Sequence, residues 1–248
     1  MIADWFRQLY ATTGINLTIF YDPFDRSRFL HGLATTIELS VICLLASVAI
    51  GVIGAWLQGS RLVWTRRIVQ GYIQFFRNTP PLVQLYFFYF GISSLLPALH
   101  NKFGTTTPLI SGFAWVCISL SFFAGAFNVE IFRSGIEAVP RATIEAAEAL
   151  GYTRLKAYWH VVLPLALRVC LPALNNNLVN LVKTTTLAFA VAVPELLYVS
   201  AQIWSDNTNV PEMMVVLLIV YVCLVGLVVL GMHRLEHELR LPGYHRAG

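Results

Sequence analysis

The residues best able to do chemistry in this sequence are charged side chains within long apolar stretches. Arg77, Glu130 and Lys183 each lie in such a stretch, and Glu195 follows closely after one. A charge inside a bilayer is costly, and it usually faces a wet cavity, a helix-bundle interior or an opposite charge. These residues therefore predict the binding and guiding of a charged solute. They lack the paired or clustered grouping that bond cleavage would need.

Arg77 directly precedes the segment Asn78-Thr79-Pro80-Pro81. Counted from Ile68 at about 1.5 Å per residue, it lies roughly 13 Å along a helix, near the middle of a bilayer. The two prolines remove helix hydrogen bonds and predict a kink there. Broken membrane helices often frame substrate sites, because their freed backbone groups become ligands. Arg77 is thus a candidate for a substrate pathway; the alternative is a structural kink with Arg77 paired internally or reaching the interface.

A second group of polar residues follows helical spacing in a later apolar stretch. It consists of Asn176, Asn180, Lys183 and Thr184. Residues three and four apart share one helix face, and an amide stripe facing lipid is unfavourable. We therefore expect the stripe to face the bundle interior and line the pathway, where Lys183 attracts a carboxylate. The alternative is that it joins helices or two chains.

Two glutamates are candidates for gates. Glu130 lies near the inner end of its stretch and can pair with Arg133 one turn on; a gate and a structural ion pair are both open. Glu195 follows Pro194, about 30 residues from the start of its stretch, and a straight helix of that length would extend roughly 45 Å. We therefore expect a break, a separate short outer helix after Pro194, and an outer-gate role for Glu195.

The elements that position these residues are membrane-spanning helices. The chain has 248 residues, of which 57% are hydrophobic and 12% charged, whereas a soluble domain has about 25% charged residues. A helix needs about 20 apolar residues to cross the hydrocarbon core. We predict an all-α integral membrane protein with a single transmembrane domain over residues 1–248. Its expected spans are 33–57, 68–95, 109–132, 165–193 and 213–232.

Positive charge predicts the orientation of these spans. With the N-terminus outside, eleven of the 17 Lys and Arg residues fall on the inner side and four on the outer side. Cytoplasmic loops are enriched in these residues, so the C-terminus and the long loop 133–164 are expected in the cytoplasm. The first residues lack the pattern of a cleaved signal peptide. We expect the first membrane helix to be the targeting signal.

Other function classes find little support. The four cysteines lie far apart, without a Cys-x-x-Cys pair or Cys/His cluster, so no metal site is expected. The net charge is +4, but there is no nucleic-acid motif or basic tail, so no nucleic-acid partner is expected.

The loop 133–164 is more than a linker. Pro140 suits a helix start, Ala, Glu and Leu then favour helix, and Gly151 can end it. Its small apolar face would consist of Ala146, Ala149 and Leu150, with Glu145 and Glu148 on another face. A second short helix over Thr153–Val162 is expected to stop at Leu163-Pro164. This composition suits either a docking peg for a soluble partner or an ordinary solvated helix.

The spacing in this loop resembles the signature loop of permease subunits of ATP-binding-cassette (ABC) importers. The matching residues are Glu145, Ala146, Ala147, Gly151, Val161, Leu163 and Pro164. The resemblance implies a type I importer-like fold whose loop docks into a groove on a separate ABC ATPase dimer. It also implies that ATP and magnesium bind that ATPase, so that this chain has no cofactor and is no enzyme.

Further motifs resemble one subgroup, the permeases for polar amino acids such as histidine, glutamate, glutamine, arginine and opines. These motifs are Arg77–Gln84, Glu130–Ile136 and Lys183–Leu187, and the likeness runs from about Leu30 to Gly243. The chain departs from the family at Ala142-Thr143, usually Gly-Gln, and at Thr184–Thr186, usually Asp-Thr-Ser.

The likeness to this subgroup implies the setting in which the chain works. That setting is the bacterial inner membrane, with lipid around the spans and a periplasmic solute-binding protein outside. A second permease subunit, the same or related, would complete the pathway, and an amino acid would be carried inward. The rival is a stand-alone secondary amino-acid transporter, which would need no ATPase. The chain shows no internal repeat of the kind such carriers often have.

Overall fold

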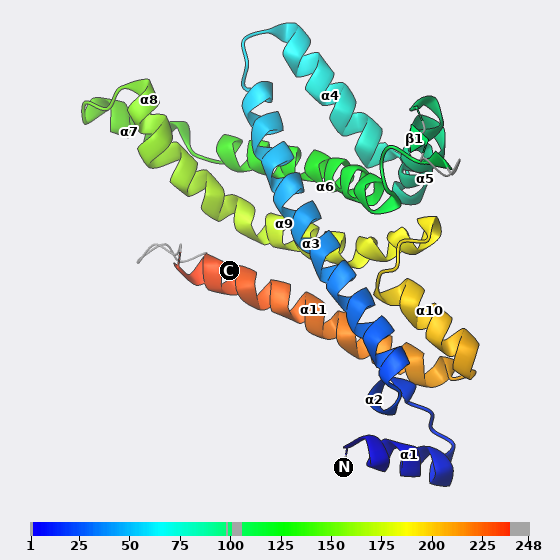
Figure 1. Ribbon diagram of the computed structural model, residues 1–248. Coiled ribbons are helices and arrows are strands. Elements are labelled where there is room, and N and C mark those ends of the chain that lie inside the picture. Colours follow the sequence, from blue (N-terminus) through cyan, green and yellow to red (C-terminus); the bar gives the residue numbers. More distant parts are fainter. Residues whose placement is uncertain (1, 98, 101–105, 239–248) are drawn as a thin grey trace. The chain divides into compact units, whose positions relative to one another are not determined.

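The computed structural model describes residues 2–97, 99–100 and 106–238, most of which lie in helices (Figure 1). Lys102, Arg240, Arg246 and the Leu241–Gly243 end of the family likeness lie outside the described residues. The chain divides into two compact units. The first unit holds residues 1–44, 80–120 and 181–225, and the second unit holds residues 45–79, 121–180 and 226–248.

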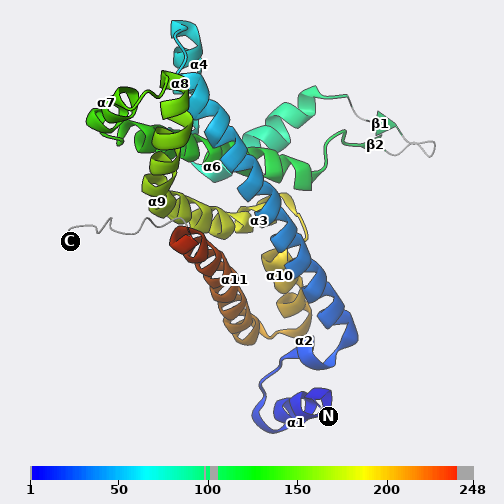
Figure 2. The same ribbon diagram turned by 90° about the vertical axis from the view of Figure 1, so that its left-hand side faces the viewer.

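The first unit contains the N-terminal helices, two short strands, and the short helices that follow Pro80 and Thr184. Its elements are α1 (Ile2–Thr13), α2 (Thr18–Tyr21), the first part of α3 (Pro23–Gln58), α5 (Pro81–Tyr86), η1 (Phe87–Ile92), η2 (Ser93–Leu95), β1 (Leu99–His100), β2 (Thr106–Thr107), the first part of α6 (Gly112–Glu137), η4 (Thr185–Val191), α10 (Leu196–Asn207) and the first part of α11 (Val210–Glu238). The strands pair antiparallel and lie between η2 and α6 in the chain, and Figure 2 shows them projecting beyond the start of α6.

The helix α3 begins ten residues before the expected span. Asp22 precedes Pro23, and the Phe24 N–H donates to Asp22 Oδ1 at 3.1 Å. An aspartate cap followed by proline in the first turn is a favourable helix start. Hydropathy missed this start because the first turns carry Asp25 and Arg28, whose ion pair of 2.6 Å leaves Asp25 buried.

The core of the first unit joins α3, α10 and α11. Its buried members are Ile19, Phe29, Leu196, Val199, Ile203, Met213 and Leu217. Polar contacts complete it: Asn207 Nδ2 donates to Asp25 Oδ2 at 2.8 Å, and the Asn16 N–H donates to Glu212 Oε1 at 3.0 Å. The short helix expected after Pro194 is confirmed as α10.

The second unit contains the rest of α3 and α6, together with the loop. Its other elements are α4 (Val63–Asn78), α7 (Arg141–Ala149), α8 (Arg154–Ala157), η3 (Tyr158–Val162), α9 (Leu163–Thr184) up to Asn180, and the end of α11. Its packing brings α3 and α6 unusually close. A Cβ at Gly54 would collide with Val129, and one at Gly125 would lie 2.7 Å from Ile50 Cγ2. Small residues allow this approach between membrane helices.

Four helices in the described part of the chain are long and apolar enough to cross a membrane. They overlap the first, third, fourth and fifth expected spans, but the helix of the third begins only at Gly112 and that of the fourth ends at Val191. The expected second span is instead divided: α4 ends at Asn78, Thr79 and Pro80 are extended, and a shorter apolar helix covers Pro81–Leu95. The predicted interruption at the Asn78–Pro81 segment is therefore confirmed, as a full break rather than a kink.

Candidate functional site

The loop between α6 and α9 contains the helix that its sequence predicts. The helix α7 begins directly after Pro140 and ends where Gly151 takes a φ of +87°. The Gly151 N–H donates to the Glu148 carbonyl at 3.0 Å, and the Tyr152 N–H donates to the Ala147 carbonyl at 3.1 Å. This pair of bonds is the Schellman ending. Glycine is favoured at its left-handed position, because a side chain there is strained.

The exposed face of α7 is small and apolar, with the two carboxylates of Glu145 and Glu148 beside it. Glu145, Ala146 and Ala149 are exposed, and Leu150 is 81% exposed. Ala147 is buried and faces the chain itself. The sequence grouped Ala147 with its exposed neighbours, so only part of the predicted set offers a surface to another molecule.

The loop, which belongs to the second unit, is packed against the start of α9. The loop packs through a cluster of three buried residues, Val139, Val162 and Ala166. Ile144 and Tyr158 are partly buried against this cluster. The fixed geometry of α7 suits a docking element, since a rigid helix loses little conformational entropy when a partner binds.

The expectation that Leu163-Pro164 stops a second short helix is wrong. The helical segment runs without interruption from α8 through η3 into α9, and Leu163 and Pro164 are its residues. The Leu163 N–H donates to the Tyr158 carbonyl, five residues back, in a π-helical turn. Because this wider turn shifts the hydrogen-bond pattern before the proline, the missing N–H of Pro164 does not break the helix. Both residues are partly exposed, and they belong to α9 and not to the loop.

Arg77 is part of a chain of charges between α4 and α6. Arg77 Nη1 lies 3.1 Å from Glu130 Oε2, and Arg133 Nη2 lies 3.6 Å from Glu130 Oε1. Arg133 also pairs with Glu137 at 3.1 Å. The guanidinium of Arg77 lies 5.3 Å from the centre of the Phe127 ring. The predicted Glu130–Arg133 pair is confirmed, and Arg77 is paired internally, as one of its two readings allowed.

The polar stripe on α9 does not face the interior of this chain. Asn176, Asn180 and Lys183 are all exposed, while Thr184 is half-buried and donates to the Leu181 carbonyl at 2.8 Å. The expectation of a stripe inside the chain's own bundle is therefore wrong. Helical spacing predicts that these residues share a face, but it does not predict which face meets the rest of the chain.

The amide that does point inward is Asn177, which sequence reasoning missed. Its Nδ2 donates to Asn128 Oδ1 at 2.7 Å and to the Ala124 carbonyl at 3.0 Å. Asn128 Nδ2 in turn donates to Ser47 Oγ at 3.2 Å, and both Asn128 and Ser47 are fully buried. The signal was available in part, because Asn177 lies within the run Asn175–Asn177, and Asn128 lies two residues before Glu130.

Glu195 is a buried helix cap. Its carboxylate accepts hydrogen bonds from the Leu197 and Tyr198 N–H groups at 2.9 and 2.8 Å. Tyr221 Oη donates to it at 3.2 Å, and the neighbouring Leu196 N–H donates to Thr36 Oγ1 at 2.9 Å. Burial raises the pKa of Glu195, and these hydrogen bonds oppose the rise. Glu195, the candidate outer gate, thus lies where α3, α10 and α11 meet.

A model of the family described as binding-protein-dependent transport system inner membrane component matches residues 32–240. The chain is 32% identical over 202 residues to the octopine transport system permease protein OccM of Rhizobium radiobacter, covering 77% of this chain and 80% of that protein. It is 29% identical over 225 residues to the probable glutamine ABC transporter permease protein GlnM of Bacillus subtilis (strain 168), covering 91% and 98%.

A solved structure is also similar. It is the crystal structure of an amino acid ABC transporter with histidines, with a TM-score of 0.74 and 26% identity over 86% of this chain and 94% of that chain. The expected fold class, an all-α membrane protein like the permeases of type I ABC importers, is confirmed.

Proposed function

We infer that this chain, which belongs to the family of binding-protein-dependent transport system inner membrane components, carries a polar amino acid into the cell. It is a multi-pass inner-membrane protein and the permease subunit of an ABC importer. Two relatives named for octopine and glutamine, and a similar transporter with histidines, support an amino acid with a polar side chain as its cargo.

The observation that carries the coupling role is the exposed face of α7. This face is a small apolar surface beside Glu145, on a helix that ends at Gly151 and packs against the rest of the second unit. Such a surface suits a groove on a soluble protein. That protein is an ABC ATPase dimer. ATP and magnesium bind there, and this chain supplies no catalytic group or cofactor.

The exposed stripe on α9 supports a second permease subunit. Asn176, Asn180 and Lys183 are costly to leave against lipid. A second chain of the same or a related kind covers them, and the space between the two chains is the pathway. Lys183 attracts the carboxylate of the amino acid in this pathway. Arg77 adds positive potential, and its ion pair with Glu130 fixes the position of the Arg77 side chain.

The orientation follows from the positive charges: the N-terminus is outside and the C-terminus is cytoplasmic. The loop with α7 then meets the ATPase, and the opposite side receives the amino acid from a periplasmic solute-binding protein.

The test is reconstitution of the full chain in vesicles with its ATPase and its binding protein. Uptake of labelled glutamine, glutamate, histidine, arginine and octopine is measured with and without ATP, and stimulation of ATP hydrolysis by each is recorded. We expect uptake of at least one of them only with ATP and the ATPase. Uptake by the chain alone, driven by an ion gradient, would identify a secondary transporter instead.

A further inference from the structure

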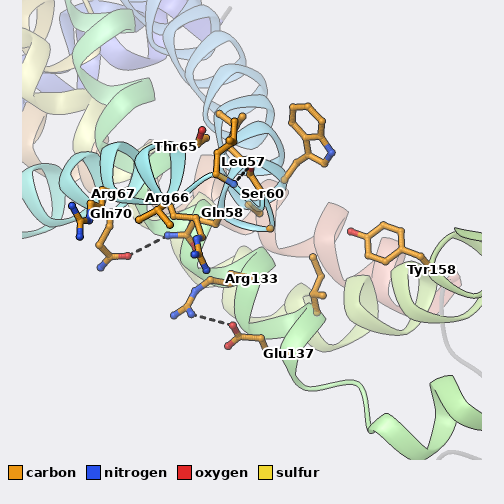
Figure 3. Close-up of a pocket in the computed structure, with 16 residues that line it drawn as sticks. Leu57, Gln58, Ser60, Thr65, Arg66, Arg67, Gln70, Arg133, Glu137 and Tyr158 are labelled. Atoms are coloured by element: carbon orange, nitrogen blue, oxygen red, sulfur yellow. Dashed lines mark hydrogen bonds and ion pairs between the residues drawn. The ribbon is translucent and has the colours of Figure 1, made fainter. Parts of the chain in front are cut away.

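An open cleft of about 1030 Å³ lies in the second unit, at the end of α3 and between α4 and the end of α6 (Figure 3). None of the residues assigned to coupling or to the substrate pathway lines it. Three arginines do: Arg66 and Arg67 from α4, and Arg133 from α6. Gln58, from the end of α3, contributes an amide that bonds Gln70 at 3.3 Å.

The cleft holds more positive than negative charge. Glu137 is the only carboxylate among the described residues that line it, and it already pairs with Arg133 at 3.1 Å. In the described part of the chain, neither Arg66 nor Arg67 has a carboxylate within salt-bridge distance, and Arg133 Nε is buried without a hydrogen-bond partner. Figure 3 shows the Arg66 side chain between Gln58 and Arg133. Like charges gathered in this way repel one another unless an anion joins them.

The rim of the cleft is apolar and aromatic. Trp56 is 73% exposed and Leu62 is 67% exposed, and both line it. Just outside, Trp64 is 74% exposed, and the Arg67 guanidinium lies 5.6 Å from the centre of its ring. Exposed tryptophans beside arginines are typical of the membrane–water interface, where ring and headgroup share one depth.

We propose that this cleft binds the phosphate headgroup of an anionic phospholipid, with the acyl chains lying along the apolar rim. Guanidinium groups suit a phosphodiester because they donate two parallel hydrogen bonds to its oxygens. A free phosphate would satisfy the arginines but would leave Trp56 and Leu62 uncovered. A zwitterionic lipid would cover the rim, but its ammonium group would offset the charge of its phosphate and repel the arginines. The inference needs only the membrane location of the chain, and its failure would leave the transport function untouched.

Native mass spectrometry of the full-length chain tests the proposal. The chain, in neutral detergent, is titrated with phosphatidylglycerol, with phosphatidylcholine and with inorganic phosphate. We expect retention of phosphatidylglycerol at a stoichiometry near one per chain, with much weaker retention of the other two. Each arginine near a membrane surface contributes about fivefold to anionic lipid binding. R66Q and R67Q should therefore weaken retention about fivefold each, and together about 25-fold.

Arg61 provides the matched control. It is exposed in the short connection between α3 and α4 but does not line the cleft, and R61Q removes the same charge. R61Q should leave retention within about twofold of wild type, and R66K, which keeps the charge, should bind more lipid than R66Q. An unchanged size-exclusion profile verifies folding of each variant.

Several results would overturn the proposal. Equal losses in R61Q and R66Q would show diffuse charge attraction instead of a site. Competition by inorganic phosphate at the concentrations at which the lipid binds would identify a free-anion site. Equal retention of phosphatidylcholine would show that the net negative charge of the lipid is not recognised, so that the cleft is no site for anionic lipid. Complete displacement of lipid when the ATPase is added would show that the cleft belongs to a protein interface.

Discussion

The helices α7 and α9 each expose the kind of side chain that their surroundings disfavour. The helix α7, in a loop, exposes Ala146, Ala149 and Leu150. The helix α9, within an apolar span, exposes Asn176 and Asn180. The first surface is unfavourable in water and the second in lipid. Each surface therefore suits the partner that we propose for it: an apolar groove for α7, and a second permease chain and a solute for α9.

The largest effect is expected from breaking the α7 surface. Gly151→Arg places a side chain at a φ of +87°, where a non-glycine residue costs roughly 1–2 kcal/mol. It also adds bulk at the edge of the docking face. We expect ATPase co-purification to fall by about tenfold or more and uptake to be lost. Glu145→Lys, which reverses the charge beside the same face, should act in the same direction.

Gly71→Ala is the matched control for this change. Gly71 is exposed on α4, and a Cβ there would meet no atom within 4 Å. Its uptake should equal that of wild type. If the ATPase still binds Gly151→Arg and transport continues, α7 is not the docking element.

Loss of the charge on α9 tests the other half of the comparison. Lys183 is exposed, so Lys183→Met should not unfold the chain. A hydrogen bond to a charged group contributes about 1.5–3 kcal/mol, so we expect the substrate concentration for half-maximal uptake to rise about tenfold or more. Lys183→Arg should restore most of the affinity. Unchanged affinity and rate in Lys183→Met and in Arg77→Gln would remove both from the pathway.

Two adjacent asparagines allow the exposed and the buried faces of α9 to be compared. Asn177→Ala removes the partner of buried Asn128, and an unsatisfied buried group costs about 1–3 kcal/mol. We expect a lower melting temperature in detergent for Asn177→Ala and no change for Asn176→Ala. In uptake the order should reverse once equal amounts of folded protein are compared. Equal destabilisation by both changes would mean that Asn176 is also covered within the chain.

The smallest effect is expected from the ion pair between Arg77 and Glu130. Both side chains are partly exposed, at 39% and 26%, and such pairs contribute about 0–1 kcal/mol. Glu130→Gln should hardly change the melting temperature. If Glu130 holds Arg77 for the pathway, the variant should shift the substrate affinity, and combining it with Arg77→Gln should add nothing further. Additive losses would show that the two residues act separately.

The sequence predicted features that depend on local chemistry. The helix end at Gly151, the break at Pro80 and the helix after Pro194 follow from backbone rules at single residues. The features that it missed depend on packing. Periodicity placed Asn176, Asn180 and Lys183 on one face of a helix, but only contacts with Asn128 show that the neighbouring face is the buried one.

Pro164 shows a further limit of local rules. Proline usually ends a helix, but the π-helical turn at Tyr158–Val162 absorbs its missing hydrogen bond. The backbone of the preceding turn, and not the proline itself, decides that outcome. The role of Glu195 as a buried cap was likewise invisible, since it depends on Tyr221, which lies 26 residues further along the chain.

The close approach of α3 and α6 has a mechanical consequence. Val129 fills the space left by Gly54, and Ile50 fills the space left by Gly125. Each helix thus inserts a side chain into the space beside a glycine of the other. These two contacts oppose translation or rotation of one helix against the other. Within the second unit, these two segments therefore act as one stiff strut. Under the proposed coupling role, a displacement of the loop that follows α6 would therefore move α3 and α6 together.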